Sequence, residues 1–439
     1  MASESSGNSD WLTRTQAALW HPCTQMKHLE RMPPLPIARG EGPWLVDFDG
    51  RRYLDCISSW WVNLFGHANP RINAAITDQL GRIEHAMLAG CTHAPVVALS
   101  ERLGKLAGLG HVFYGSDGAS AIEIALKMSF HFWRNVGQTG KTGFVSLRDG
   151  YHGETLGALS VTDVALFKDT YAPLLHPSHQ VMSPDWRRAE PEESAEAFAL
   201  RAAASLEDFL AECADTTAAV ILEPLVQGAA GMAMYHPIYL ACAREMCDRY
   251  RVHLIADEIA VGFGRSGTMF ACEQAEITPD FLCLSKGITG GYLPLSCVLT
   301  SDTVYQAFYD DATARGFLHS HSYTGNALAC RAALAVLDIF DTDDVLAANR
   351  LKAARFTELL APVAAHPRVR NFRHTGMIWA FDVDHAPPGF SRDFHQRALE
   401  RGLFLRPIGG AVYFMPPYVI EEPEMALMAR VTLELLDQS

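Results

Sequence analysis

Short apolar runs alternate with helical patterns through the middle of the chain. Six runs lack the in-and-out alternation of a half-exposed sheet, namely 111–114, 144–147, 218–222, 253–256, 281–284 and, as a further candidate, 296–300. Such runs are typical of strands in a buried, largely parallel sheet. Helical patterns lie between them, for example at 119–133 and 238–250. We therefore predict an α/β fold with helices on both faces of a mostly parallel central sheet.

The two ends of the chain have a different pattern. Residues 44–48 and 52–55 are strand-like and flank Asp49-Gly50, which predicts a β-hairpin. After residue 325, two helical stretches precede two strand-like segments, at 327–340, 345–360, 377–383 and 411–414. We predict a large domain over 66–325 and a smaller α+β domain formed by both ends, 1–65 and 326–439. Residues 1–10 are small and polar, and we expect them to be disordered.

Composition limits the classes of partner and the compartment. The 439 residues include 36 basic and 50 acidic ones, a net charge of −14. Nucleic acids and anionic membranes both require a basic face, so neither is expected as a partner. The ten cysteines form no C-x-x-C pair, which favours free thiols over disulfides or a zinc site, and we expect no metal. No export-type segment begins the chain, and no apolar run approaches ~20 residues. We therefore expect a cytoplasmic protein.

An acid and a lysine follow two successive predicted strands. Asp257 ends the apolar run at 254–256 and precedes a glycine-rich turn, and Lys286 follows the run at 281–284. In open α/β sheets ligands bind beyond the carboxyl ends of the strands. Pyridoxal phosphate uses this pair, since a lysine amine condenses with its aldehyde and an acid pairs with its pyridine nitrogen. Taken singly, Lys286 also fits a solvated loop lysine and Asp257 a helix cap.

Two further segments suit the same coenzyme. Ser116, Asp117 and Gly118 lie between a predicted strand and the helix near 119, where backbone N–H groups can hold a phosphate. Asp117 is a poor partner for a dianion, so we assign the binding to main-chain and hydroxyl groups. Tyr151 follows the next strand and is expected to stack on the coenzyme ring, with a core tyrosine as the alternative.

With these residues the chain resembles the class III aminotransferases of fold type I, and within them the branch that aminates 8-amino-7-oxononanoate in biotin biosynthesis. The resemblance covers almost the whole chain and rests on segments 20–22, 58–61, 90–95, 150–153, 223–228, 257–267, 286–291, 406–407 and 413–418. It implies a homodimer with shared active sites. It also implies a ping-pong transamination between the pyridoxal and pyridoxamine forms of the coenzyme.

The resemblance assigns roles to individual residues. Lys286 is the Schiff-base and proton-transfer residue, Asp257 the pyridinium partner, and Tyr151 the stacking residue at the border of the substrate. His321 and Ser322 reach the phosphate of the neighbouring subunit. The substrate residues it implies are Trp60 and Trp61 as the channel wall, Arg406 as the partner of the keto-acid carboxylate, and Ser320 and Tyr413 close by.

Two departures from the family pattern affect the substrate side. Cys23 stands where many members have an aromatic residue after His-Pro, so a contact there is lost or replaced. Residues 291–294 and 319–326 resemble the lysine-using branch, whereas 59–61 and 413–417 resemble the S-adenosylmethionine-using branch. For the amino donor we favour S-adenosylmethionine, with lysine as the alternative.

Two other functions compete with this one. Another class III enzyme, such as an ω-amino-acid transaminase or an aminomutase, would share the coenzyme residues, but the tryptophan pair and the Arg406 region disfavour it. A non-catalytic nucleotide-binding module would use the glycine-rich turn 262–267, which lies late in the chain and lacks an early βαβ context.

Overall fold

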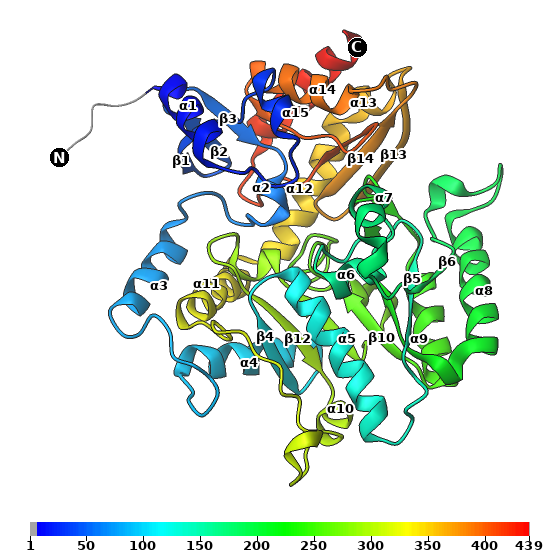
Figure 1. Cartoon of the computed structure of the whole chain (residues 1–439). Helices are drawn as coiled ribbons and strands as arrows, with labels where there is room; N and C mark the ends of the chain where they lie inside the picture. Colours follow the sequence, from blue (N-terminus) through cyan, green and yellow to red (C-terminus); the bar gives the residue numbers. More distant parts are fainter. Residues whose placement is uncertain (1–6, 439) are drawn as a thin grey trace.

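A seven-stranded sheet forms the centre of the molecule (Figure 1). The structure is a computed structural model that describes residues 7–438. In spatial order the strands are β4 (His111–Gly115), β12 (Ser296–Thr300), β11 (Phe281–Leu284), β10 (His253–Asp257), β7 (Thr217–Leu222), β5 (Gly143–Leu147) and β6 (His179–Val181). β12 runs antiparallel to both neighbours, and every pair from β11 to β6 is parallel. The predicted mostly parallel sheet is confirmed.

Alternate residues of the central strands enter different cores. In β7, Val220 and Leu222 pack with α8 (Ala195–Cys213) and α9 (Ile238–Tyr250), whereas Ala219 and Ile221 pack with α5 (Gly118–Asn135). Helices therefore cover both faces of the sheet, as predicted. Burial on both faces also explains why these strands are apolar throughout.

Other helices, turns of 3₁₀ helix and a short ribbon occur along the chain. The helices are α3 (Pro70–Leu80), α4 (Ala94–Ala107), α6 (Leu156–Val161), α7 (Ala165–Lys168), α10 (Asp302–Gln306) and α11 (Ala327–Asp343). Turns of 3₁₀ helix lie at Met26–Glu30, Asp169–Leu174, Trp186–Arg188, Ala214–Thr216, Ala271–Ala275, Lys286–Thr289 and Thr313–Arg315. A two-stranded ribbon consists of β8 (Val226–Gln227) and β9 (Ala233–Met234).

The two ends of the chain meet in one sheet. Its order is β1 (Ile37–Glu41), β2 (Trp44–Asp47), β3 (Arg52–Asp55) and β15 (Leu403–Phe404), and the predicted hairpin of β2 and β3 is confirmed. A second sheet contains β13 (Val369–Thr375), β14 (Ile378–Val383) and β16 (Ala411–Phe414). The helices of these regions are α1 (Asn8–Ala18), α2 (Ser58–Trp61), α12 (Val345–Leu359), α13 (Ala361–Ala364), α14 (Phe390–Glu400) and α15 (Glu422–Asp437).

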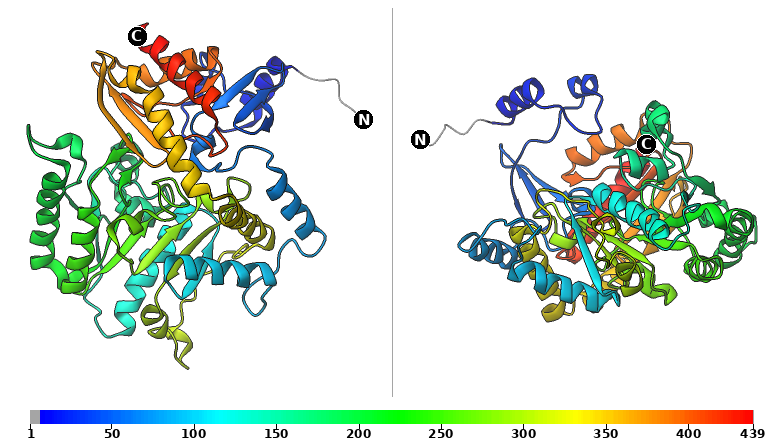
Figure 2. Two further views of the ribbon diagram at one scale, coloured as in Figure 1. Left: turned by 180° about the vertical axis from the view of Figure 1, so that it is seen from behind. Right: turned by 60° about the horizontal axis from the view of Figure 1, so that its bottom comes forward.

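Both small sheets lie beside each other, above the central sheet in the view of Figure 1. Seen from behind in Figure 2, α12 runs from them toward the central sheet and its helices. The domain limits at 65/66 and 325/326 stay predictions.

The expectation of disorder over residues 1–10 is wrong where the structure describes that segment. Residues 1–6 lie outside the described residues, and α1 begins at Asn8. The Asn8 amide group donates from Nδ2 to Asp47 and accepts from the N–H of Phe48, and Trp11 stacks on Phe48 with ring centroids 4.8 Å apart. The segment is polar, but contacts to the distant hairpin order it.

All ten cysteines are free thiols, as predicted. Among residues 7–438, none of the helices combines the length and apolar character that a membrane crossing requires.

Candidate active site

Lys286 lies at the carboxyl end of β11, where the chain turns into a 3₁₀ helix. Its backbone adopts the left-handed conformation, with φ 44°, which aims the half-buried side chain at Trp61. Lys286 Nζ is 4.4 Å from the centre of the Trp61 ring. Burial lowers the pKa of Lys286, and the carboxylates of Asp257 and Glu223 act in the opposite direction. A lowered pKa favours the neutral amine that a nucleophile requires.

Asp257 ends β10, the strand next to β11, and is held by a buried histidine. Asp257 Oδ2 lies 2.7 Å from His152 Nδ1, and Oδ1 accepts a hydrogen bond from the N–H of Ile259. Both side chains are almost fully buried. His152 fixes the orientation of the carboxylate, a role that the sequence analysis did not assign to it. The only local signal was its position beside Tyr151.

A second carboxylate lies near this pair. Glu223 is buried, and its two oxygens accept hydrogen bonds from the N–H groups of Tyr151 and Gly228. Burial raises the pKa of Glu223 to about 7. Through these two hydrogen bonds the Glu223 side chain links the turn that carries Tyr151 to the ribbon of β8 and β9.

The predicted phosphate loop joins β4 to α5. Asp117 is the N-cap of α5, and its Oδ1 accepts hydrogen bonds from the N–H and Oγ of Ser120, both at 2.9 Å. The next N–H groups, of Gly118 and Ala119, have no acceptor within the helix. Ser116 is partly exposed immediately before the cap. This donor set suits an anion, because the N–H groups and the helix dipole both favour negative charge.

Tyr151, Glu154 and Cys23 form a row of polar contacts. Tyr151 OH donates to Glu154 Oε1 over 3.0 Å, and Cys23 Sγ lies 4.0 Å from the same oxygen. Burial and Glu154 raise the pKa of Cys23, while Arg406 acts in the opposite direction. Cys23, which stands where many family members have an aromatic residue, therefore contacts Glu154. No role was assigned to Glu154 from the sequence.

Trp60 and Trp61 are presented by an unusual turn. All four residues of α2, from Ser58 to Trp61, have positive φ angles between 47° and 73°. Left-handed backbone is unfavourable for residues other than glycine, so contacts from elsewhere must hold the turn. Buried Asp55 accepts hydrogen bonds from the N–H and Oγ of Ser59, and Ser58 Oγ donates to the carbonyl of Met415.

The two tryptophans extend from Lys286 toward Arg406. Trp61 Nε1 donates to Tyr413 OH over 3.1 Å. Trp60 is 47% exposed, and the guanidinium of exposed Arg406 lies 5.4 Å from the centre of its ring. An amine and a guanidinium are thus joined by an aromatic wall, which suits an apolar chain with a carboxylate at one end.

Ser320, His321 and Ser322 belong to a separate loop before α11. His85 Nε2 lies 2.8 Å from the carbonyl oxygen of Ser322, and His321 pairs with His319. Across residues 7–438, no hydrogen bond or ion pair connects these three residues to Lys286, Asp257 or Arg406 of the same chain. Ser320 and Arg406 thus share no polar contact among the described residues of one chain, and the assignment of Ser320 to the substrate stays a prediction.

Comparisons with known proteins agree on one family. The family model for aminotransferase class-III matches residues 25–432. An adenosylmethionine-8-amino-7-oxononanoate aminotransferase from Helicobacter pylori is 45% identical over 96% of both chains. The crystal structure of the enzyme of that name from Methanocaldococcus jannaschii superposes with a TM-score of 0.92 at 35% identity, covering 98% of this chain and 99% of the other. An amine transaminase from an uncultivated Pseudomonas species, in its PLP-bound form, gives a TM-score of 0.90 at 33% identity, with 96% and 98% coverage.

Proposed function

This chain belongs to the class III aminotransferases, a family that works with pyridoxal phosphate, and we propose that it converts 8-amino-7-oxononanoate to 7,8-diaminononanoate in biotin biosynthesis, with S-adenosylmethionine as amino donor. The observation that carries this proposal is the wall of Trp60 and Trp61 between Lys286 and Arg406. The keto acid has a carboxylate at one end of an aliphatic chain and a ketone near the other. Arg406 would bind the carboxylate while the ketone lies near Lys286.

The donor set fits the coenzyme. The N–H groups at the start of α5 suit its phosphate, and a carboxylate held by His152 suits its ring nitrogen. The amine of Lys286, on the next strand of the sheet, has a lowered pKa because it is buried. Tyr151 is proposed to lie against the ring. When bound, pyridoxal phosphate supplies an electrophilic carbon and an electron-withdrawing ring.

The residues of this chain would then divide the work. Lys286 Nζ accepts the proton from the α-carbon of the donor and returns a proton to the former keto carbon in the second half-reaction. Asp257 would face the ring nitrogen of the coenzyme, because His152 and the N–H of Ile259 hold its carboxylate in one orientation. Donor and keto acid use the same cleft in turn, which gives a ping-pong cycle.

The proposal includes a homodimer in which His321 and Ser322 of each subunit complete the phosphate site of the other. It is supported by large apolar side chains exposed beside that loop, Leu318 at 78%, Tyr323 at 66% and Met87 at 62%. Exposed apolar groups that lie together mark surfaces that partners cover. The proposal also includes the cytoplasm as the compartment, supported by ten free thiols.

The test is a product assay with the pyridoxal-phosphate-loaded protein. The keto acid is supplied with S-adenosylmethionine alone, with lysine alone, or with both donors together. In the mixtures with both donors, only one donor carries a ¹⁵N amino group. The product diaminononanoate and its label are measured by mass spectrometry. Label from S-adenosylmethionine in the product supports the proposal. Label from lysine alone would show that lysine, and not S-adenosylmethionine, is the amino donor. No product with either donor would refute the assigned reaction.

A second candidate is an amine transaminase, favoured by the similarity to the Pseudomonas amine transaminase. In that case simple amines would convert the coenzyme to its amino form, and pyruvate would restore it. The half-reactions are followed by the absorbance of the coenzyme. A rate with simple amines far above that with S-adenosylmethionine and lysine would support this alternative.

A further inference from the structure

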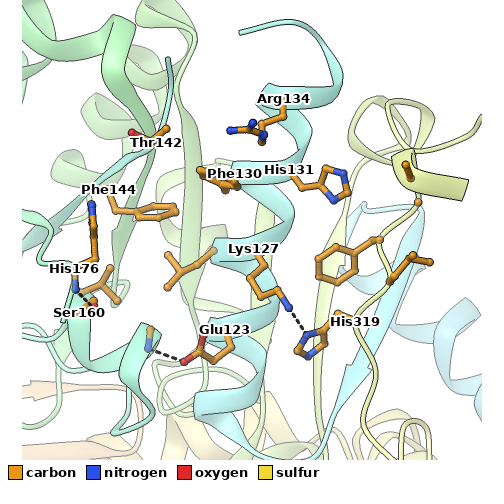
Figure 3. A pocket seen from close by; sticks show the side chains of 17 residues that line it. Glu123, Lys127, Phe130, His131, Arg134, Thr142, Phe144, Ser160, His176 and His319 are labelled. Atoms are coloured by element: carbon orange, nitrogen blue, oxygen red, sulfur yellow. Dashed lines mark hydrogen bonds between the residues drawn. The ribbon is translucent and has the colours of Figure 1, made fainter. Parts of the chain in front are cut away.

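A lysine and two histidines form a chain of hydrogen bonds beside the proposed dimer surface. Lys127, on the outer face of α5, places its Nζ 2.8 Å from His319 Nδ1 (Figure 3). His319 Nε2 then lies 2.8 Å from His321 Nε2. The Lys127 end lines a cavity of about 660 Å³ between α5, α6 and the loop that leads to His319.

The direction of this chain follows from the chemistry of its members. An ammonium group can only donate, so His319 Nδ1 must accept from Lys127. A neutral His319 consequently carries its proton on Nε2 and donates to His321. His321 Nε2 must then accept, which puts the proton of a neutral His321 on Nδ1. Each ring is left with one permitted tautomer.

The surroundings keep His319 neutral and Lys127 available. Partial burial, together with the charges of Lys127 and His321, lowers the pKa of His319, and Glu123 acts weakly in the opposite direction. Glu123 is occupied elsewhere, since its Oε1 accepts from the N–H groups of Gly157 and Ala158 at the start of α6. Its carboxylate makes no ion pair with Lys127 among the described residues. The His319 ring also stacks on Phe317, with centroids 5.6 Å apart.

We infer that Lys127 and His319 are positioning residues that lock His321 as an Nδ1–H donor for the coenzyme phosphate of the neighbouring subunit. This inference rests on the proposed function, because it requires the coenzyme and the shared dimer site. A positive charge behind a fixed donor strengthens its hydrogen bond to an anionic oxygen. Lys127 would therefore act on the phosphate without touching it.

Coenzyme binding to the apo-protein tests the role of the phosphate. Dissociation constants are measured for pyridoxal phosphate and for pyridoxal, which lacks the phosphate. Lys127→Met is expected to weaken pyridoxal phosphate binding about tenfold, or 1.4 kcal/mol, and to leave pyridoxal binding unchanged. Lys105→Met, which removes an exposed lysine of α4, is the control and should change neither constant.

A pair of variants at His319 separates the relay from simple packing. Gln at this position can accept from Lys127 and donate to His321, whereas Leu can do neither. His319→Gln should keep most of the affinity for pyridoxal phosphate, and His319→Leu should lose it as Lys127→Met does. In the apo-protein, ¹⁵N NMR of labelled histidines should show His321 with its proton on Nδ1, and this preference should disappear in Lys127→Met.

The outcomes separate the two proposals. Equal losses for pyridoxal and pyridoxal phosphate, or no loss in Lys127→Met, would overturn the relay while leaving the proposed function in place. A His321 proton on Nε2 in the wild type would overturn it as well. If the wild-type protein binds neither compound, the proposed function fails, and the NMR measurement still reports whether the hydrogen-bond chain exists.

Discussion

Trp61 contacts Lys286 with the face of its ring and donates from its edge to Tyr413. The first contact is 4.4 Å from Nζ to the ring centre, and the second is 3.1 Å from Nε1 to the hydroxyl oxygen. One indole thus links the proposed reacting amine to the buried strand β16. Movement of the Trp61 ring would change both the surroundings of the amine and the wall for the substrate.

Replacement of the lysine is the first prediction. Lys286→Ala should lower turnover by about 10³-fold or more, because both the nucleophile and the proton carrier are removed. The visible absorbance of the lysine-bound coenzyme should disappear as well. Circular dichroism should show an intact fold, and Lys105→Ala should behave as the wild type. Full turnover in Lys286→Ala would exclude the assigned role.

Arg406 gives a prediction about substrate discrimination. Arg406→Ala should raise KM for the keto acid about 10- to 100-fold, since a charge-assisted bond to a carboxylate is lost. KM for the donor should change little. Arg350→Ala, which removes an exposed arginine of α12, is the matched control. Equal increases for donor and keto acid would remove the proposed carboxylate partner.

Shared active sites predict complementation between two impaired proteins, assayed at a pyridoxal phosphate concentration too low to saturate the His321→Ala variant. Lys286→Ala and His321→Ala subunits are mixed after mild denaturation and reassembled. Random pairing should restore up to about a quarter of the wild-type sites, because each hybrid dimer has one site with both residues intact. Activity is measured against each variant reassembled alone. No recovery, with hybrids confirmed by native mass spectrometry, would place both residues in the same subunit's site.

His253 predicts how stability depends on pH. Burial is the main cause that lowers the pKa of His253 to about 4. Asp280 acts to raise this pKa, whereas Arg244 and Lys141 act to lower it. The unfolded chain therefore binds more protons between this value and the unfolded value of ~6.5. The free energy of unfolding should fall by up to about 3 kcal/mol as the pH drops through that window. Above the window, the neutral His253 contributes its full stabilisation.

Denaturant unfolding at several pH values measures this effect. His253→Gln removes the titration, so the acid-induced loss between pH ~6.5 and ~4 should become smaller. His385→Gln, at an exposed site, should keep the wild-type dependence. A variant at residue 253 with the same slope as the wild type would contradict the prediction.

The predictable parts of the fold were those with a local cause. The six predicted strands are apolar because both faces of the sheet are buried, and the Asp-Gly turn identifies the hairpin by itself. β1, β6, β8, β9, β13 and β15 were missed. β1 and β13 have mixed burial, and the other four have only two or three residues. The order of α1 depends on Asn8 reaching Asp47, which no local pattern reveals.

For the candidate site, sequence reasoning named Lys286 and Asp257 from their places after successive strands. Two partners were missed because they are distant in the sequence. His152 and Asp257 are 105 residues apart, and Lys127 and His319 are 192 residues apart. The left-handed turn at Trp60 and Trp61 was equally hidden, because it contains no glycine to signal positive φ angles. Contacts between distant residues create these features.

The hydrogen bond from Ser58 to Met415 joins residues 357 positions apart and has an evolutionary consequence. It couples the aromatic turn to the C-terminal region, whereas Lys286, Asp257 and the phosphate loop all lie on the central sheet. Mutations around Met415 can therefore reshape the wall along which the acceptor would lie, and they reach the amine of Lys286 only through Trp61. A lineage of such enzymes can diversify its substrates while inheriting one reaction.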